Sequence, residues 1–274
     1  PKAVPNGAHR PGPSGVLSLS SSWQLAHGCV LASCGCVDDG GDLLMQYLGG
    51  KSRIAKQIAA YLKSVREPGQ LYVEPFCGAC WVLQEMENPR LASDICKDII
   101  LMWQALQQGW DPPTVVSEEE YQQFRHAEPS ALRGFVGFGC SFSGKWFGGY
   151  ARSGGRNYAA NARNSVLKQK QHLQCVQIIH QHYGDLAIEG ALIYCDPPYA
   201  GVTGYEAPTA KRFDCGLFWE TMRYWSRLNT VVISEYVAPN DFGCVLEIPT
   251  KTDMRVNSGS KEARIERLFR WHGR

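Results

Sequence analysis

The stretch "QLYVEPFCGAC", residues 70–80, joins a short apolar run to a turn that contains proline and glycine. The run is typical of a buried strand, and "WVLQEME", residues 81–87, predicts a helix that leaves the turn. Next, "RLASDI", residues 90–95, predicts a second strand that ends in an acid, and residues 97–110 predict a further helix. A strand, a glycine turn, a helix and a strand ending in an acid begin a doubly wound α/β sheet that binds a nucleoside.

The chemistry of this first unit favours a nucleoside without a pyrophosphate. Gly78 lets the chain turn sharply and approach a ligand closely, and the carboxylate of Asp94 can accept hydrogen bonds from ribose hydroxyls. Neither a GxGxxG fingerprint nor a Walker loop is present, so a phosphate cradle is not indicated. S-adenosylmethionine is one nucleoside that fits. A plain strand-to-helix connection is the alternative interpretation of the glycine turn.

The α/β pattern extends over most of the remaining chain. Residues 52–62 carry apolar side chains at helical spacing, with Ser52 as a possible N-cap, and residues 217–228 predict another helix. Short apolar runs predict strands at 191–195, 230–236, 244–248 and 264–271. If the last two strands pair as a hairpin, the sheet has an antiparallel edge.

The strand "ALIYC", residues 191–195, runs directly into "DPPY", residues 196–199. A ring-conjugated exocyclic amine is a poor nucleophile, and a carboxylate and a backbone carbonyl can together orient its lone pair. Asp196 would supply the carboxylate, while Pro197 and Pro198 would hold the carbonyl in place. Tyr199 offers a face on which a planar base can stack. The alternative is a loop that contains Asp-Pro-Pro by chance.

A basic segment interrupts the α/β pattern. No acidic residue occurs between Glu128 and Asp185, whereas aromatic residues and glycines are frequent there. This composition predicts an inserted, loop-rich element with exposed cations and aromatic rings, which suits contact with phosphates and bases. The expected DNA contacts are Arg133, Lys145, Trp146, Arg152, Arg156 and Arg163.

The 274 residues are enough for one large α/β domain with an insertion. No apolar run approaches the roughly 18 residues that span a bilayer, so we do not expect a membrane protein. The chain has 11 cysteines, and only Cys77 and Cys80 form a CxxC, without a second pair to complete a metal site. We therefore expect no metal and free thiols in a reducing cytosol, with a redox pair as the alternative.

The first 44 residues differ from the rest and are rich in proline, glycine and serine. We expect Met45 to be the natural start and residues 1–44 to be a non-native or disordered extension, while a signal peptide is the less favoured alternative. The expected parts of the body are a cofactor-binding part (45–110), a target-recognition insert (111–184) and a catalytic part (185–274).

Four blocks of the sequence together resemble the Dam-like DNA adenine methyltransferases, particularly the phage-type enzymes. They are "YLGGK" (47–51), "VEPFCGAC" (73–80), "SDI" (93–95) and "YCDPPY" (194–199), in the order of the family, with the basic segment between the last two. The resemblance implies a Rossmann-like methyltransferase sheet with an inserted target-recognition region. The sequence departs from the family at two positions: Tyr47 replaces a tryptophan, and Cys80 replaces the second loop glycine. The side chain of Cys80 would narrow the cofactor pocket.

The resemblance also implies roles for individual residues. Binding of S-adenosylmethionine would involve a set that spans all four blocks, with Asp185 near the cofactor's adenine. This set is Tyr47, Lys51, Pro75, Phe76, Gly78, Asp94, Asp185 and Asp196. The catalytic block would be Asp196 to Tyr199. The implied partner is double-stranded DNA, and the implied protein is a monomer when acting, in the cytoplasm of a bacterium or phage-infected cell.

The expected function is therefore transfer of a methyl group from S-adenosylmethionine to N6 of an adenine flipped out of duplex DNA. Methylation of cytosine N4 uses the same amine chemistry and is the nearest alternative, and methylation of RNA adenine or protein glutamine is a further one. No Pro-Cys dipeptide occurs, which disfavours methylation of the cytosine ring carbon. From a different class, the chain could be a DNA-binding module with a degenerate cofactor site.

Overall fold

The computed structural model describes residues 50–152, 154–199, 213–250 and 264–273, all within the unit Asp38–Arg274. Residues 1–44 and Tyr47 lie outside the described residues, so the predictions made for them are not addressed. The described helices are α1 (Ala55–Val65), α2 (Lys97–Gln107), α3 (Glu118–Arg125), α4 (Ala131–Gly139), α5 (Tyr158–Lys170) and α6 (Cys215–Trp225). The strands are β1 (Tyr72–Glu74), β2 (Arg90–Asp94), β3 (Val176–His180), β4 (Leu192–Cys195), β5 (Thr230–Glu235), β6 (Phe242–Thr250) and β7 (Arg264–Trp271).

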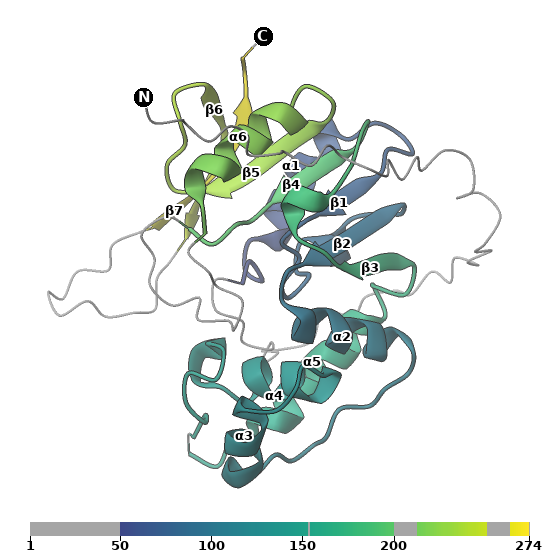
Figure 1. The fold of residues 1–274 in the computed structure, drawn as a ribbon, viewed down its shortest axis with the longest axis vertical. Helices are drawn as coiled ribbons and strands as arrows, with labels where there is room; N and C mark the ends of the chain where they lie inside the picture. Colours follow the sequence, from purple (N-terminus) through teal and green to yellow (C-terminus); the bar gives the residue numbers. More distant parts are fainter. Residues whose placement is uncertain (1–49, 153, 200–212, 251–263, 274) are drawn as a thin grey trace, which may run out of the picture. The chain divides into compact units, whose positions relative to one another are not determined.

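The strands form one sheet in the order β3-β2-β1-β4-β5-β7-β6 (Figure 1). The first five are parallel, and Val73 of β1 pairs with Leu91 of β2 on one side and Ile193 of β4 on the other. The strand order therefore reverses at β1 and β4. In doubly wound sheets, ligands bind at the carboxyl ends of the strands beside such a reversal.

The far edge of the sheet is antiparallel. β7 lies between β5 and β6 and runs antiparallel to both. This arrangement confirms the expected hairpin of the last two strands and the α/β, Rossmann-like sheet with an antiparallel edge. It also places β7, the last strand of the chain, beside the strand that follows the DPPY block in sequence.

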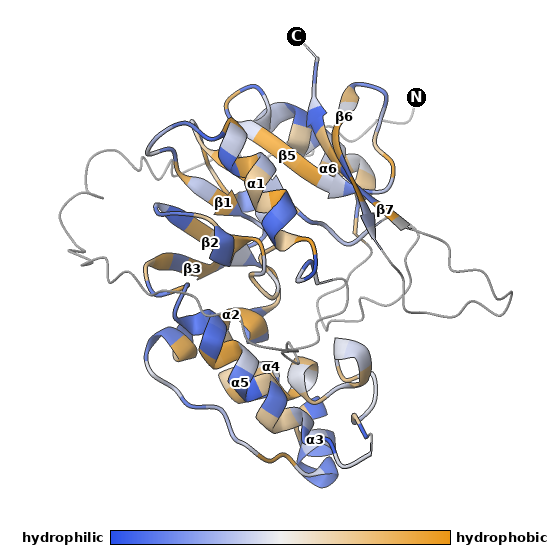
Figure 2. Ribbon diagram, turned by 180° about the vertical axis from the view of Figure 1, so that it is seen from behind, coloured by the Kyte–Doolittle hydropathy of each residue, from blue (hydrophilic) through white to orange (hydrophobic). Residues whose placement is uncertain are grey.

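Both faces of the sheet are covered, and successive residues of a strand point to opposite faces. Leu192 and Tyr194 pack in the same core as α1 and α2, whereas Ile193 and Cys195 pack in the core that contains α6. Burial on both faces explains why the central strands are continuously apolar in sequence, and Figure 2 draws β5 largely in the hydrophobic colour.

The inserted segment differs from its predicted loop-rich form. It folds into α3, α4 and α5, and α4 packs against α2 and α5 (Figure 1). The glycines of α4 face its neighbours closely: a Cβ on Gly134 would lie 2.5 Å from the Asp98 carbonyl oxygen, and one on Gly139 would lie 2.7 Å from the Cβ of Ala162. These glycines permit close helix packing and do not mark a loop.

Two elements of the structure differ from what the sequence predicts. β3 pairs with β2 as part of the sheet, although the sequence analysis placed residues 176–180 in the insert. The helices of the insert end with α5 at Lys170. The helix expected at 81–87 is only a short 3₁₀ turn, Leu83–Glu85. No helix among the described residues combines the length and the apolar character needed to cross a membrane.

Candidate active site

The loop after β1 turns through two residues in the left-handed region, Gly78 at φ 43° and Cys80 at φ 57°. The backbone N–H of Cys80 donates to the carbonyl of Cys77 at 2.7 Å, which closes a tight turn. A non-glycine residue in this conformation costs about 1–2 kcal/mol. Cys80 thus keeps the backbone form that a glycine would adopt freely, and its side chain is buried in the core. It does not project from the loop surface.

Asp94, at the carboxyl end of β2, holds this loop. Its Oδ2 accepts a hydrogen bond from the N–H of Gly78 at 3.0 Å, and its Oδ1 accepts one from the N–H of Cys96 at 2.8 Å. Burial raises the pKa of Asp94, although these backbone donors oppose the shift. Asp94, the acid expected to bind ribose, therefore also links the end of β2 to the glycine turn through a hydrogen bond.

Phe76 lies on the other side of the loop. Its ring is half-buried and its centroid is 5.0 Å from that of Tyr183, which lies in the 3₁₀ turn Tyr183–Asp185. Pro75, just before Phe76, is buried, whereas Asp185 is exposed. The contact between Phe76 and Tyr183 brings the turn that carries Asp185 beside the loop after β1. The sequence resemblance assigns both segments to cofactor binding.

The DPPY block meets Lys51 at the end of β4. The Nζ of Lys51 lies 2.9 Å from Oδ1 of Asp196 and donates to the Tyr199 hydroxyl at 2.5 Å. The ammonium is also 4.6 Å from the centroid of the Tyr199 ring. Pro197 is buried, and Pro198 is half-buried. The fold therefore brings together Lys51, Asp196 and Tyr199, which the sequence analysis singled out from two blocks 145 or more residues apart.

Two further residues belong to this cluster and were not predicted from the sequence, Glu266 on β7 and Ser234 on β5. The hydroxyls of Tyr199 and Ser234 both donate to Oε1 of Glu266, and they lie 3.2 Å from each other. Glu266 is also 3.5 Å from the Nζ of Lys51. In the sequence, Glu266 is one acid in the predicted strand "RIERLFRW", which also carries three arginines, and no pattern around it indicates a site.

Burial and charge act together on the cluster. Burial would lower the pKa of Lys51, but the Asp196 and Glu266 carboxylates outweigh it and raise that pKa above its ordinary value. Burial raises the pKa of Asp196, and the Lys51 ammonium opposes that shift. Among the described residues, two acids thus face one ammonium, which favours an additional positive charge nearby.

A second missed acid, Glu74, lies at the end of β1. Its side chain accepts a hydrogen bond from the Tyr72 hydroxyl at 2.6 Å and is fully enclosed in the protein. Burial raises the pKa of Glu74 to about 8, a shift that the Tyr72 hydrogen bond opposes. Glu74 is therefore largely protonated at neutral pH.

The cations of the insert do not form the uniform exposed surface that we predicted. Arg133 is buried and pairs with Asp98 at 2.8 Å, and its guanidinium carbon lies 5.1 Å from the centroid of the buried Trp146 ring. These two side chains stabilise the packing of α4, so the expectation that they face DNA is corrected. Arg152 pairs with Glu118, and Arg163 pairs with Asp111 at 2.8 Å.

The DNA contacts expected of Lys145, Arg152, Arg156 and Arg163 stay predictions. Lys145 is half-buried, and its side chain lies against Gly148. Arg156 is exposed and forms neither a hydrogen bond nor an ion pair with any other described residue. Arg156 is thus the arginine of the insert whose charge is least compensated within the described part of the chain.

Glu266 is expected to act on the reaction by positioning Tyr199 and Lys51. Replacing it with alanine removes the acceptor of both hydroxyls, and kcat should fall about 10- to 100-fold. Glu266→Gln keeps an oxygen acceptor and should recover part of this loss. Steady-state kinetics with separate kcat and KM values test the expectation. Glu247→Gln, which alters an exposed acid paired with Arg267 on the same hairpin, is the control. An alanine variant with normal kcat would contradict the role.

Glu74 is expected to make stability depend on pH. The unfolded carboxyl releases its proton near the ordinary pKa of 4.5, whereas the folded one keeps it up to about pH 8. Unfolding therefore releases a proton between these values, and the free energy of unfolding falls as the pH rises through this window. Glu74→Gln removes this dependence. In thermal melts, the stability of the variant relative to that of the wild type should therefore increase from pH 4.5 to pH 8. Parallel stability curves would contradict the assignment.

Comparisons with known proteins agree with the class defined by this fold. The order of the sheet and a family match over residues 47–132 both agree with a methyltransferase fold. Residues 47–132 match the family of D12 class N6 adenine-specific DNA methyltransferases, which confirms the resemblance to the Dam-like family that the four sequence blocks indicated. No curated protein sequence matches the chain significantly.

Among solved structures, the candidate methyltransferase yhhF of Escherichia coli is similar at 11% identity and a TM-score of 0.33, over 80% of this chain and 84% of that one. The rRNA methyltransferase aviRa of Streptomyces viridochromogenes is similar at 12% identity and a TM-score of 0.35, over 78% of this chain and 84% of that one. Values this low bear on neither substrate nor cofactor.

Proposed function

We propose that this protein transfers a methyl group from S-adenosylmethionine to N6 of an adenine flipped out of duplex DNA. The observation that carries the proposal is the meeting of Lys51 with Asp196 and Tyr199 of the DPPY block, at the carboxyl end of β4 beside the reversal of strand order. The match of residues 47–132 to the D12 family supports the choice of adenine in DNA.

The chain's residues fit S-adenosylmethionine in two respects. The glycine turn at the end of β1 and Asp94 at the end of β2 are joined by a hydrogen bond, which places side by side the turn and the acid that bind a nucleoside in doubly wound sheets. Within the described part of the chain, the buried cluster has two acids against the Lys51 ammonium, which suits a ligand that carries a positive charge. When bound, S-adenosylmethionine would supply an activated methyl group. Lys51, Pro75, Phe76, Gly78, Asp94, Asp185 and Asp196 are the described residues proposed to hold it.

Asp196 and the carbonyl of Pro197 would accept hydrogen bonds from the two hydrogens of the target amine. These hydrogen bonds would direct the lone pair of the nitrogen toward the methyl donor. The new N–C bond would form as the methyl–sulfur bond breaks, S-adenosylhomocysteine would leave, and the amine would lose one proton to solvent. Pro197 and Pro198 restrict the backbone, so this carbonyl is held in place before the substrate arrives. Tyr199 would stack on the base, and Glu266 fixes the orientation of its hydroxyl.

Lys51 also affects how the target amine binds to Asp196. In the structure the Lys51 ammonium contacts Oδ1 of Asp196, which is one of the two acceptors that the target amine would use. The incoming base would replace this contact, while Glu266 and the Tyr199 hydroxyl keep the ammonium in the cluster. Lys51 thereby holds the carboxylate of Asp196 ionised and correctly placed until the amine binds.

The helices of the insert, α3 to α5, are proposed as the target-recognition region. They lie between the β2 and β4 segments of the chain, and residues 129–184 contain no acid. Cytosine N4 methylation uses the same contacts to an amine and remains the second candidate, because the DPPY geometry alone does not select the base.

The proposal is tested by incubating the full chain with methyl-labelled S-adenosylmethionine and, separately, duplex DNA, single-stranded DNA and RNA. We expect label in the duplex. Direct binding of S-adenosylmethionine, followed by calorimetry without nucleic acid, separates cofactor binding from catalysis. Label in RNA alone would contradict the assignment of substrate. Failure to bind the cofactor would favour a DNA-binding module with a degenerate cofactor site.

A further inference from the structure

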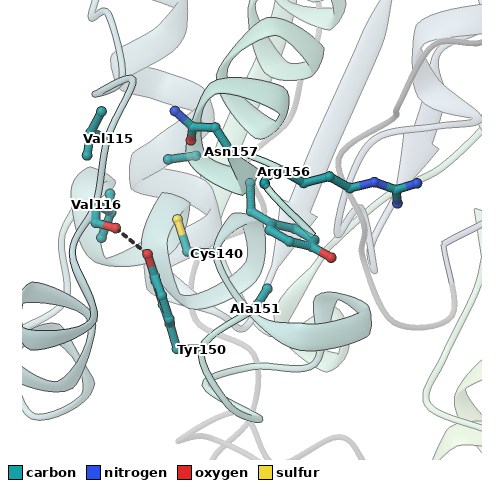
Figure 3. A pocket seen from close by; sticks show the side chains of 10 residues that line it. Val115, Val116, Cys140, Tyr150, Ala151, Arg156 and Asn157 are labelled. Carbon is teal, nitrogen blue, oxygen red and sulfur yellow. Dashed lines mark hydrogen bonds between the residues drawn. The ribbon is translucent and has the colours of Figure 1, made fainter. Parts of the chain in front are cut away.

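A cavity of about 320 Å³ lies within the helical insert and shares no lining residue with the Lys51 and Asp196 cluster (Figure 3). Small-molecule sites in proteins typically measure about 300–1,000 Å³, so this cavity is at the small end of that range. The lining residues that matter here are Val115, Val116, Tyr150, Arg156, Asn157 and Tyr158.

One wall of the cavity is fixed by hydrogen bonds. The Tyr150 hydroxyl donates to the carbonyl of Val116 at 2.7 Å, the dashed contact in Figure 3. The side chain of Asn157 donates to the carbonyl of Thr114 at 2.9 Å and accepts from the N–H of Ala160 at 3.0 Å, where it caps α5. The polar atoms of Tyr150 and Asn157 are thus satisfied, and the cavity has a preformed shape.

The mouth of the cavity carries an uncompensated positive charge. Figure 3 shows the side chain of Arg156 extending away from the other labelled residues. Arg156 forms no ion pair with any other described residue, whereas Arg152 and Arg163 pair with Glu118 and Asp111. A guanidinium without an acidic partner is free to bind a phosphate.

The remaining lining offers apolar and aromatic surface. Val115 is 68% exposed, which is high for a large aliphatic side chain beside a cavity. Tyr158, at the start of α5, is half-buried, and its hydroxyl forms no hydrogen bond with any other described residue. An aromatic ring, an exposed aliphatic side chain and a cation at the rim are the groups that bind an unstacked base and its phosphate.

We propose that this cavity is a subsite for one nucleotide of the DNA strand, with the base against Tyr158 and the phosphate on Arg156. The inference rests on the proposed function, since it takes the substrate to be DNA, and it adds a contact outside the site of methyl transfer. Its role is to fix the register of the DNA on the insert.

The first test compares Arg156→Ala with Arg163→Ala by titrating a fluorescent DNA duplex at several salt concentrations. Loss of one phosphate contact should lower the slope of log affinity against log salt by about 1. We expect this change for Arg156→Ala and a smaller one for Arg163→Ala, because Asp111 already balances the charge of Arg163. Equal slopes for the two variants would overturn the role of Arg156.

The second test concerns the ring of Tyr158. Tyr158→Ala should weaken DNA binding about 5- to 100-fold, whereas Tyr158→Phe, which keeps the ring, should bind nearly as the wild type does. Binding of S-adenosylmethionine and the thermal midpoint are measured for each variant to show that the fold is retained. If alanine and phenylalanine variants bind DNA alike, the base-stacking role is wrong.

These outcomes are separable from failure of the proposed function. If the wild-type protein methylates DNA and all four variants keep its DNA affinity and salt slope, the proposed subsite is wrong and the proposed function stands. Wild-type protein that binds RNA but no DNA duplex would overturn the choice of DNA, and the subsite with it.

Discussion

Asp196→Ala is expected to lower kcat at least about 100-fold, because it removes an acceptor aimed at the amine in the transition state. The effect should fall on kcat and not on DNA binding, since Asp196 faces Lys51 within the cluster and not the insert. Single-turnover methyl transfer and a DNA titration on the same preparation measure the two quantities.

Asp196→Asn is the matched variant for this prediction. It keeps the shape of the side chain and an oxygen acceptor, but it loses the charge that pairs with Lys51 at 2.9 Å. We expect a loss between those of the wild type and the alanine variant. An alanine variant that retains most of the wild-type rate would remove Asp196 from the catalytic step.

Arg133→Met is expected to destabilise the fold by about 3–5 kcal/mol, the typical cost of removing one partner of a buried ion pair. Arg133 is 7% exposed and Asp98 3%, and Asp98 also accepts a hydrogen bond from the N–H of Ser130 before α4. The variant would leave the Asp98 carboxylate without its cation between α2 and α4. Chemical denaturation measures the change in the free energy of unfolding.

Arg152→Met is the control for this second prediction. Arg152 and Glu118 form an exposed pair, so its loss should change stability by less than about 1 kcal/mol. Replacing both Arg133 and Asp98 with uncharged residues should recover much of the stability lost in the single variant. If Arg133→Met weakened DNA binding but left stability unchanged, the sequence-based expectation of a DNA contact would stand after all.

The central sheet could be predicted from local patterns. β4 is an apolar run that ends at Asp196, and β2 is a short run that ends at Asp94, so each strand and its terminal acid are read from contiguous residues. Because parallel strands align their carboxyl ends, the meeting of these segments at one edge also follows from sequence.

The partners of the site could not be predicted in the same way. Glu266 reaches Tyr199 and Lys51 only because β7 inserts between β5 and β6, which is a long-range choice of pairing. Nothing near Glu266 in the sequence marks an active site. The raised pKa of Glu74 likewise depends on burial, which the motif around it does not reveal.

The insert was misinterpreted for two physical reasons. Gly134 and Gly139 suggested loops, but their lack of a side chain serves the close approach of helices, which is a tertiary constraint. The acid-free stretch suggested free cations, but the acids that pair with it, Asp98, Asp111 and Glu118, precede it in the chain. Charge counted along a segment is therefore a poor guide to charge exposed on a surface.

The most direct test of the central claim is to identify the methylated nucleoside. DNA treated with the full chain and methyl-labelled S-adenosylmethionine is digested to nucleosides, which are separated and counted, with Asp196→Ala as the parallel control. The account predicts that the label is in N6-methyladenine and nearly absent from the control. Label in N4-methylcytosine alone, or equal label with the control variant, would contradict it.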